Sequence, residues 1–355
     1  MKLQNGRKIA NIQDIARAAG TSIATVSRVL SNADYPVSPL LKEKVLAAAK
    51  ELNYTPNLLG RMLKSNNNTA IGVVVPNLQN PFFNQVLIGI ESEARRRDYE
   101  LVIYSSHRDP AQERQNIMGM LQKRILGLIL FSEDLSSETV EYYVASGGCV
   151  ALLEANFELE TVIRADTDFV EAGRIAARHL IDRGHRRIAF LTSPLTKHSR
   201  RKLLEGLKTT CRDMGVPFDE QRDVIVAPSE TELDSGLYEF EQGKYLAREF
   251  LERRDGHTAI AAVNDITAYG VLQELASQKI AVPEQLSLIS FDNLPFSAML
   301  SPALTTVELP STAMGSTACH LLIDCMEDPD GAVVSRDLVF SYPCRLRVRQ
   351  SVASI

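Results

Sequence analysis

The sequence predicts a chain of two fold classes: a small all-α headpiece followed by an α/β body with mostly parallel sheets. Three observations lead to this prediction. Apolar residues recur every three or four positions over about residues 11–53, which is typical of short amphipathic helices. From about residue 70 onward, short apolar runs alternate with helical patterns, as expected for sheets covered by helices on both faces. Charge also changes sign there: residues 1–65 hold ten Lys/Arg and four Asp/Glu, a net +6, and since the whole 355-residue chain carries −5, the remainder carries −11.

The first two predicted helices lie within residues 11–31. The first has one apolar face, formed by Ile12, Ile15, Ala16 and Ala19. Asn11 is a good N-cap, and Asp14 three residues later can complete a capping box. Gly20 follows the last periodic residue, where a left-handed backbone costs least. Ser22 can cap a second helix that ends at about Leu30. Two short helices joined at a glycine have the layout of a helix-turn-helix DNA reader.

The N-terminal end of the second helix is the end that would enter the major groove. The residues predicted to contact DNA there are Thr21, Ser22, Ile23, Ala24, Thr25, Ser27 and Arg28. Arg28 can pair bidentately with guanine, whereas Ile23 and Ala24 carry no donor and can read only methyl groups and shape. Thr25 and Ser27 suit phosphates better. The alternative is an amphipathic hairpin without a partner, but a basic head on an acidic body favours phosphate binding.

A third helix and a short hinge segment follow. Ser38 before Pro39 predicts a capped helix start, and the apolar stripe of that helix continues to about Asn53. Residues 57–64 have the pattern of a short helix that is too small to be stable alone in water, and residues 65–68 are typical of a linker. The predicted domains are therefore a headpiece (1–56), a hinge with linker (57–68) and a body (69–350).

The headpiece and hinge resemble those of the lactose-repressor family of bacterial regulators, on the motifs at residues 24–30, 45–49 and 52–57. In that family two hinges fold on operator DNA and pair in the minor groove. The resemblance implies that Leu63 wedges between bases, with Asn57, Arg61 and Lys64 also at the DNA; a plain linker leucine is the alternative. Gly60 stands where the family usually has alanine, so this hinge is expected to depend more on DNA for its order.

The body is long enough for one large or two medium domains. The predicted strands are short apolar runs at residues 70–75, 101–105, 127–131, 150–153, 188–191, 224–226, 259–263, 286–291 and 305–307. The helical patterns between them include residues 83–98, 110–123, 172–183, 243–253 and 266–278. Strands that alternate with helices in this way predict parallel sheets.

The resemblance continues through the body, on motifs at residues 80–83, 184–190, 263–270 and 302–307. The family's body is similar to periplasmic sugar-binding proteins: two doubly wound parallel-sheet lobes joined by crossovers, with the ligand between them. Carried over to this chain, lobe one is residues 69–166 with 307–332, and lobe two is residues 167–306 with 333–350.

The same resemblance names candidate effector-binding residues. Asn264 and Asp292 match positions that hydrogen-bond the effector, and each follows a predicted strand, where ligands bind in open α/β sheets. Phe82 matches an aromatic position that can stack on a sugar ring. Tyr238 aligns near a further contact, although a nearby insertion leaves its register open. The alternatives are a helix cap or turn residue for Asn264 or Asp292, and ordinary core for Phe82.

One position departs from the family pattern. Many members have an arginine three residues before the glycine that matches Gly206, and here that residue is Leu203. Either one of the preceding cations, Arg200, Arg201 or Lys202, takes the role, with Arg201 and Lys202 as the candidates carried forward, or the effector is unusual. A solvated basic run is an equal alternative.

Other features narrow the function. Five scattered cysteines without a CxxC spacing are typical of reduced thiols in the cytoplasm. The sequence has no phosphate-loop, dinucleotide-binding or nucleophile-elbow motif, which argues against an enzyme and leaves no cofactor implied. No run approaches 18 apolar residues, so no membrane span is expected.

Two hypotheses result. The first is a homodimeric, sequence-specific repressor of carbohydrate-metabolism genes, which binds a pseudo-palindromic double-stranded operator and is controlled by a sugar-like small-molecule effector bound between its two lobes. The alternative is a sugar-binding protein without specific operator recognition.

Overall fold

The computed structural model describes residues 10–30, 37–52, 54, 69–165, 167–228, 238–328 and 342–355. It divides into two compact units, Met1–Asn68 and Thr69–Ile355. The predicted hinge residues Asn57, Gly60, Arg61, Leu63 and Lys64 lie outside the described residues.

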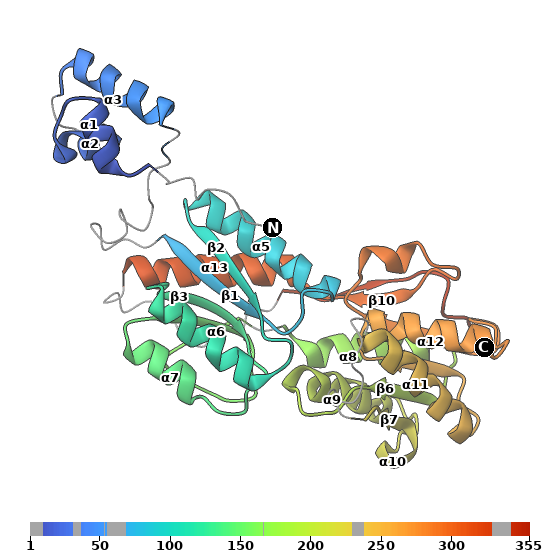
Figure 1. Cartoon of the computed structure of the whole chain (residues 1–355). Helices are drawn as coiled ribbons and strands as arrows, with labels where there is room; N and C mark the ends of the chain where they lie inside the picture. The colour runs from blue at the N-terminus through green and yellow to red at the C-terminus, as the bar shows by residue number, and fades with distance from the viewer. Residues whose placement is uncertain are drawn as a thin grey trace, which may run out of the picture. The chain divides into compact units, whose positions relative to one another are not determined.

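The first unit contains the three predicted headpiece helices, α1 (Ile12–Ala18), α2 (Ile23–Leu30) and α3 (Pro39–Glu51) (Figure 1). The predicted capping box is confirmed: the Asn11 side chain accepts from the amides of Gln13 and Asp14, and the Asp14 carboxylate accepts from the Asn11 amide at 3.0 Å. Gly20 has the expected left-handed backbone, with φ +61°. The prediction that Ser38 caps the third helix is wrong, because Ser38 precedes α3 without a capping hydrogen bond from its side chain.

The headpiece helices meet in a small apolar core. Its buried members are Ile15, Ala16, Val26, Val29, Val45, Ala48 and Ala49. All three helices contribute, so the core fixes the angle between α1 and α2 and leaves the opposite side of α2 exposed.

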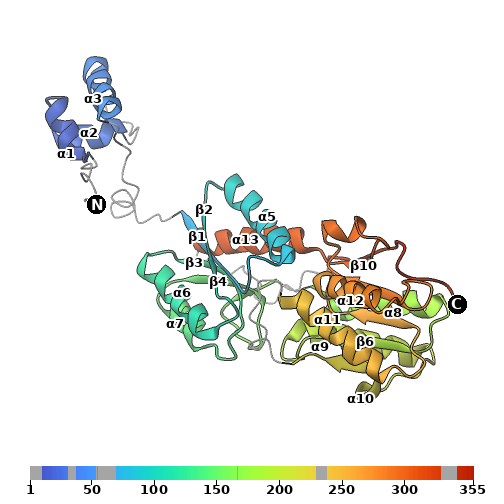
Figure 2. The same ribbon diagram turned by 45° about the vertical axis from the view of Figure 1, so that its right-hand side comes forward.

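The second unit has two lobes, each with a mostly parallel sheet (Figure 2). The first lobe contains β1 (Ala70–Val75), α5 (Pro81–Arg96), β2 (Glu100–Ser105), α6 (Pro110–Gln122), β3 (Gly127–Phe131), α7 (Glu138–Ala145), β4 (Cys149–Glu154), β5 (Ile163–Arg164) and α13 (Ser311–Glu327). Its strands run in the order β2-β1-β3-β4-β5, all parallel. Helices α5 and α13 cover one face, and α6 and α7 cover the other.

The second lobe contains α8 (Phe169–Asp182), β6 (Ile188–Thr192), α9 (His198–Asp213), α10 (Glu220–Asp223), β7 (Val224–Val226), α11 (Tyr238–Arg253), β8 (Ala259–Ala262), α12 (Asp265–Ser277), β9 (Ser287–Phe291), η2 (Pro295–Ala298), β10 (Thr305–Glu308) and β11 (Arg345–Arg347). Its strand order is β11-β10-β9-β8-β6-β7, parallel except for β11. Helices α8 and α9 cover one face and α11 and α12 the other. Because the inner strands are covered on both faces, every residue of β6, β8 and β9 is buried, which explains their largely apolar sequences.

All nine predicted strands are present, and β5 and β11 are the two that the pattern missed. The sequence of β11 alternates charged and apolar residues, as suits an edge strand, and β5 is only two residues long. The crossover between lobes differs from the predicted residue 307, because β10 continues to Glu308 in the second sheet. The second lobe also extends past residue 350: the Ile355 amide donates to the Arg183 carbonyl at 2.9 Å.

Glycines set the closest helix–helix approaches of the body. Where α8 crosses α9, a Cβ on Gly206 would overlap the Val170 carbonyl oxygen, and a Cβ on Gly173 would overlap the Leu203 carbonyl oxygen. The other two close helix pairs repeat this arrangement, α5–α13 with Gly89 and Gly315, and α11–α12 with Gly243 and Gly270. Each crossing therefore brings two backbones into contact, and a larger residue has no space.

Gly206→Ala is expected to lower the free energy of unfolding of the body by about 3 kcal/mol, because two packed backbones must separate. The measurement is thermal or urea unfolding. Gly119→Ala is the matched control, since Gly119 lies in α6 with nothing within 4 Å of its Cβ position, and alanine favours the helix. Equal stability of the two variants would contradict the proposed tight crossing.

Candidate functional site

The exposed side of α2 is a surface that the headpiece core does not use. Ile23, a large aliphatic side chain, is 45% exposed. Ala24 and Arg28 are also exposed, whereas Val26 and Val29 of the same helix are buried. The exposed face thus combines small and apolar groups with one guanidinium, the chemistry that reads base edges in a major groove.

The start of α2 is fixed by local hydrogen bonds. The Thr25 amide donates to Ser22 Oγ at 3.1 Å, and the two hydroxyls lie 2.9 Å apart. Ser22 therefore caps the helix, as predicted. Thr21 and Ser27 are half-buried beside this end. Because a helix N-terminus carries partial positive charge, this end of α2 suits a phosphate group.

In the body, Asp292 lies immediately after β9 and is only 6% exposed. Its φ of +111° falls in the region that side-chain-bearing residues rarely adopt, and Asn293 follows with φ +57°. Hydrogen bonds hold this backbone: the Asp292 amide donates to the Val307 carbonyl at 2.9 Å, and Arg349 Nη2 donates to Asn293 Oδ1 at 2.6 Å. Maintained strain of this kind is typical of binding sites.

The Asp292 carboxylate is in an unfavourable environment for a charge. Burial raises its pKa well above the ordinary value, and the neighbouring carboxylates of Asp265, Glu239 and Glu154 add to the shift, while a backbone amide hydrogen bond from Asp265 opposes it. Among the described side chains, none donates a hydrogen bond to Asp292. A buried acceptor without side-chain donors is costly unless a ligand supplies them.

Asp265, which is fully buried, shows the contrasting case. Its carboxylate accepts from the hydroxyls of Ser290, Ser297 and Thr306 and, at 2.7 Å, from the Leu294 amide. This network joins the start of α12 to the loop after β9. Asp265 is therefore a structural residue that holds the Asp292 loop in place.

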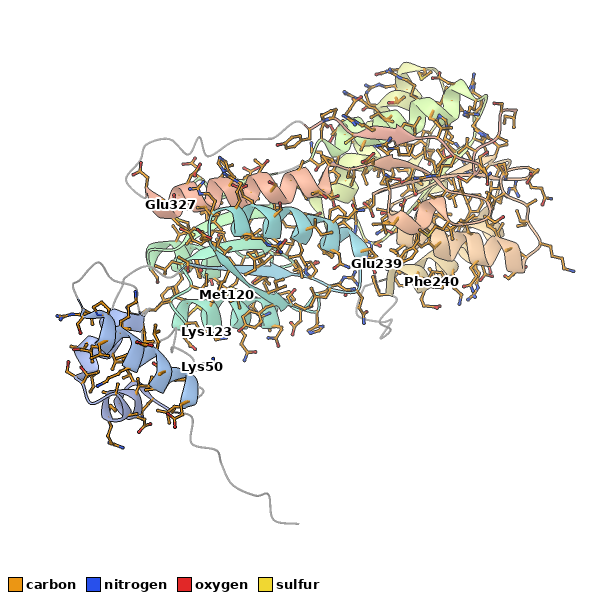
Figure 3. The ribbon with its side chains drawn as sticks, turned by 90° about the horizontal axis from the view of Figure 1, so that it is seen from above. Lys50, Met120, Lys123, Glu239, Phe240 and Glu327 are labelled. Atoms are coloured by element: carbon orange, nitrogen blue, oxygen red, sulfur yellow. The ribbon has the colours of Figure 1, made fainter. Side chains whose placement is uncertain are left out.

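Contacts between the lobes converge on Glu239, which lies near the N-terminal end of α5 in Figure 3. Its carboxylate accepts from Asn80 Nδ2 of the first lobe at 3.1 Å and pairs with the Arg108 guanidinium, also of the first lobe. The Arg108 and Glu239 side chains are 15% and 8% exposed. A second bridge, Lys197 Nζ to Glu133 Oε1 at 2.5 Å, joins the same two lobes. Partly desolvated pairs of this kind depend on the relative position of the lobes.

The other predicted effector residues, Tyr238, Phe82 and Asn264, differ from one another in their contacts. Tyr238 is buried, accepts from Gln242 Nε2, and has the Arg108 guanidinium 4.5 Å from its ring centroid. Phe82 is half-buried, packs against the cores of both lobes, and makes an edge contact with Phe131 at 6.4 Å between centroids. Asn264 caps α12, accepting from the Thr267 amide at 2.8 Å.

These placements bear on the alternatives left open by the sequence. Asn264 is a helix cap through its Oδ1, which agrees with one of the alternatives. Its Nδ2 makes no hydrogen bond to the described residues. Phe82 contributes to both cores and still retains exposed surface.

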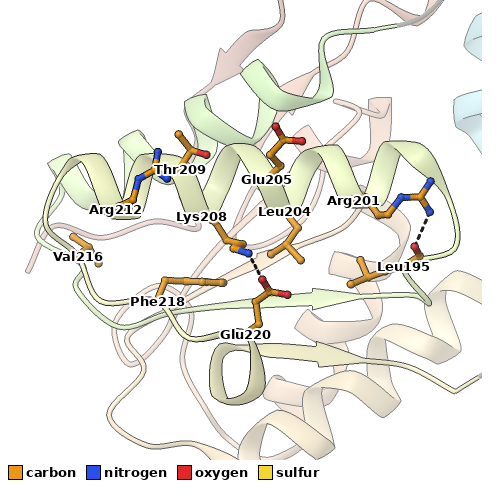
Figure 4. A pocket seen from close by; sticks show the side chains of 10 residues that line it. All are labelled: Leu195, Arg201, Leu204, Glu205, Lys208, Thr209, Arg212, Val216, Phe218 and Glu220. Carbon is orange, nitrogen blue, oxygen red and sulfur yellow. Dashed lines mark hydrogen bonds and ion pairs between the residues drawn. The ribbon is translucent and has the colours of Figure 1, made fainter.

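Arg201 and Lys202 do not share contacts with the groups around Asp292. Arg201 Nη1 donates to the Leu195 carbonyl at 2.9 Å and borders a separate pocket of about 710 Å³ between α9 and the residues before α10 (Figure 4). Lys202 Nζ pairs with Glu205 at 3.0 Å. Leu203, the departure from the family arginine, is 3% exposed in the core of the second lobe. In this structure both cations therefore have partners on or near α9, and a role for either of them in effector binding stays a prediction.

A metal site and a membrane-spanning helix are both absent from the described residues. No cluster of three or more His, Cys, Asp or Glu side chains there is arranged to hold a metal ion. No helix in the same residues has the length and apolar character needed to span a bilayer.

Both units of the chain are similar to known protein families. Residues 11–57 match the model of bacterial regulatory proteins of the lacI family, and residues 177–352 match a periplasmic binding protein-like domain. The chain is 32% identical to the ribose operon repressor of Escherichia coli (strain K12) over 324 residues, which is 90% of this chain and 94% of that protein. This chain belongs to the lacI family.

Further lacI-family matches agree with this assignment. Catabolite control protein A of Priestia megaterium is 32% identical over 343 residues, 96% of this chain and 98% of that protein. The crystal structure of the lac repressor dimer bound to operator and the anti-inducer ONPF has the same fold, with a TM-score of 0.80 at 23% identity, covering 98% of this chain and 100% of that one. The predicted family and fold class are confirmed, and the chain is a DNA-binding transcriptional regulator.

Sequence reasoning missed two carboxylates near Asp292 in this lacI-family chain, Glu154 and Glu239, and it missed Arg108, the ion-pair partner of Glu239. Glu154 ends β4, Glu239 lies in the first turn of α11, and Arg108 lies in the loop between β2 and α6. Polar residues at such positions are common, so the sequence alone does not select them. Their importance comes from the approach of the two lobes.

Proposed function

We propose that this lacI-family chain is a repressor that binds a pseudo-palindromic operator as a homodimer and responds to a sugar-like effector bound between its lobes. The observation that carries the proposal is the presence, in one chain, of the exposed base-reading face of α2 and the buried Asp292, to which no described side chain donates a hydrogen bond. The first group explains DNA recognition, and the second calls for a ligand that donates hydrogen bonds. In this proposal the protein regulates transcription and does not catalyse a reaction. It acts in the cytoplasm, where the operator lies.

Sugar hydroxyls match the chemistry of the proposed effector site. They donate to a carboxylate such as Asp292 and accept from an amide such as Asn264 Nδ2, while the exposed part of Phe82 offers an apolar surface for a ring face. With Leu203 in place of the family's arginine, the site favours a neutral sugar over a sugar acid or phosphate. The similarity to a ribose operon repressor makes a pentose the first effector to test.

Control of DNA binding follows from the contacts between lobes. An effector held by Asp292 changes the free energy of the neighbouring Glu239 contacts with Arg108 and Asn80, and hence the relative position of the lobes. Because each headpiece continues into the first lobe at residue 69, this change alters the spacing of the two headpieces in a dimer. Effector and operator affinities are then coupled reciprocally.

The test uses the full-length protein in a selection from random double-stranded oligonucleotides, followed by competition against random duplex over a range of salt concentrations. We expect enrichment of a symmetric sequence, with affinity that changes when ribose or another neutral sugar is added. Equal affinity for selected and random duplex, with sugar binding intact, would instead support the sugar-binding protein without operator recognition.

A further inference from the structure

Two cysteines that are 176 residues apart in the sequence face each other in the first lobe. Cys149 is the first residue of β4, and Cys325 lies in the last turn of α13. The Cys325 thiol is directed at the Cys149 sulfur, with 2.7 Å between the two Sγ atoms. A disulfide bond has a length of about 2.05 Å, so a small side-chain rotation separates this pair from covalent geometry.

The five cysteines of the chain differ in their exposure to solvent. Cys149 and Cys325 are both partly exposed, whereas Cys211, Cys319 and Cys344 are 0%, 0% and 8% exposed. The two thiols that an external oxidant can reach are therefore the two that already lie together.

The main chain around the pair is held in place from both sides. The Cys149 amide donates to the Leu126 carbonyl at 2.7 Å. At the end of α13, Arg97 Nη1 donates to Asp324 Oδ1 at 3.0 Å and Arg97 also pairs with Glu327, which is labelled at that helix end in Figure 3. A bond between the sulfurs thus links two elements whose positions are already fixed.

We propose that Cys149 and Cys325 are a reversible oxidation site that closes to a disulfide when the protein meets a peroxide. One thiol ionises, and its thiolate attacks a peroxide oxygen; the O–O bond breaks to give a sulfenic acid, and the hydroxide that leaves takes up the proton released by that thiol to form water. The second thiol attacks the sulfenic sulfur, the S–S bond forms, and the hydroxide that leaves takes up the thiol proton as water. Two thiols and one hydrogen peroxide become one disulfide and two waters.

The structure predicts how this site responds to pH. The hydrogen bond with Cys325, together with burial, raises the pKa of Cys149. Since the thiolate is the reactive form, disulfide formation is expected to be slow at neutral pH and to accelerate as the pH rises. The closed bond ties the last turn of α13 to β4 across a long loop, so the oxidised body is expected to melt several °C higher than the reduced one.

The experiment treats the full-length protein with a small excess of hydrogen peroxide, blocks remaining thiols by alkylation, and maps peptides under non-reducing conditions. We expect the loss of two thiols per chain, a linked peptide pair containing Cys149 and Cys325, and full recovery with dithiothreitol. Cys211→Ser is the matched control and should still form the link.

Single variants test each half of the pair. Cys149→Ser and Cys325→Ser should lose both the linked peptide and the melting shift, while the remaining partner becomes trappable by a sulfenic-acid reagent. Persistence of five thiols in the wild-type protein, pairing with a buried cysteine, or links only between chains would each overturn the proposal.

Discussion

Asp292→Asn is expected to make the regulator unresponsive to its effector while leaving operator binding intact. Asparagine keeps the shape of the side chain but loses the charge that strengthens hydrogen bonds from effector hydroxyls. Such charge-assisted bonds contribute about 1.5–3 kcal/mol each, so effector affinity should fall roughly ten- to a hundredfold. The measurement is calorimetric titration with the effector, beside operator binding with and without it.

The same substitution is expected to stabilise the effector-free protein at neutral pH. The pKa of Asp292 in the folded state is raised well above its ordinary value of 3.8, so the unfolded chain ionises first as the pH increases. The free energy of unfolding therefore falls as the pH rises from about 4 through the raised pKa. Asparagine removes this contribution, and the gain in stability over wild type should disappear below about pH 3, where Asp292 is protonated in both the folded and the unfolded state.

Asp265→Asn is the matched control for this prediction. Its carboxylate accepts four hydrogen bonds, so an amide nitrogen in its place faces donors and should destabilise the body by about 3 kcal/mol. An Asp292→Asn variant that is destabilised like Asp265→Asn, or that keeps its effector response, would remove Asp292 from the effector site.

Arg28→Ala is expected to weaken operator binding by about 1–3 kcal/mol, a roughly five- to 150-fold loss, and to relax specificity at one base pair. The physical reason is the loss of a bidentate pair with guanine, which no other exposed group on the described part of α2 can replace. The measurement is competition between the selected operator, its single-base variants and random duplex at one salt concentration.

Arg17→Ala controls for the loss of one positive charge from the headpiece. Arg17 lies on α1, its side chain is 81% exposed, and its ion pair with Asp14 is long, at 3.6 Å. Removing it should weaken binding slightly and equally on all sequences. If Arg28→Ala showed that same uniform loss, Arg28 would be a phosphate contact and the proposed base reading would be wrong.

Most of the secondary structure could be predicted because it depends on neighbouring residues. The Asn11–Asp14 capping box, the left-handed Gly20 and the buried runs of the strands are all set by residues within a few positions. The edge strand β11 escaped prediction because its alternating Arg345-Leu346-Arg347 pattern becomes a strand only by pairing with β10. The motifs of the headpiece were equally local, and they identified the family.

The effector site was only partly predictable. Asn264 and Asp292 follow strands β8 and β9, which placed them at the edge of the sheet where we propose that the effector binds. The basic run at Arg201 and Lys202 looked equally suitable in sequence, yet its side chains bond to nearby carbonyls and to Glu205. Helix periodicity alone did not decide which of these cations would face a ligand, because that depends on how α9 packs.

By itself, the sequence determined the helix predicted to contact DNA (α2), the alternation of strands and helices in the body, and the family of the chain. Each of these depends on short-range backbone preferences and apolar periodicity. Tertiary structure alone decided that Glu239 meets Arg108, that Asp292 is buried among carboxylates, and that Cys149 meets Cys325. Glu239 and Arg108 are 131 residues apart, and Cys149 and Cys325 are 176 residues apart. Only the strand order and the contact between the lobes bring such distant residues together.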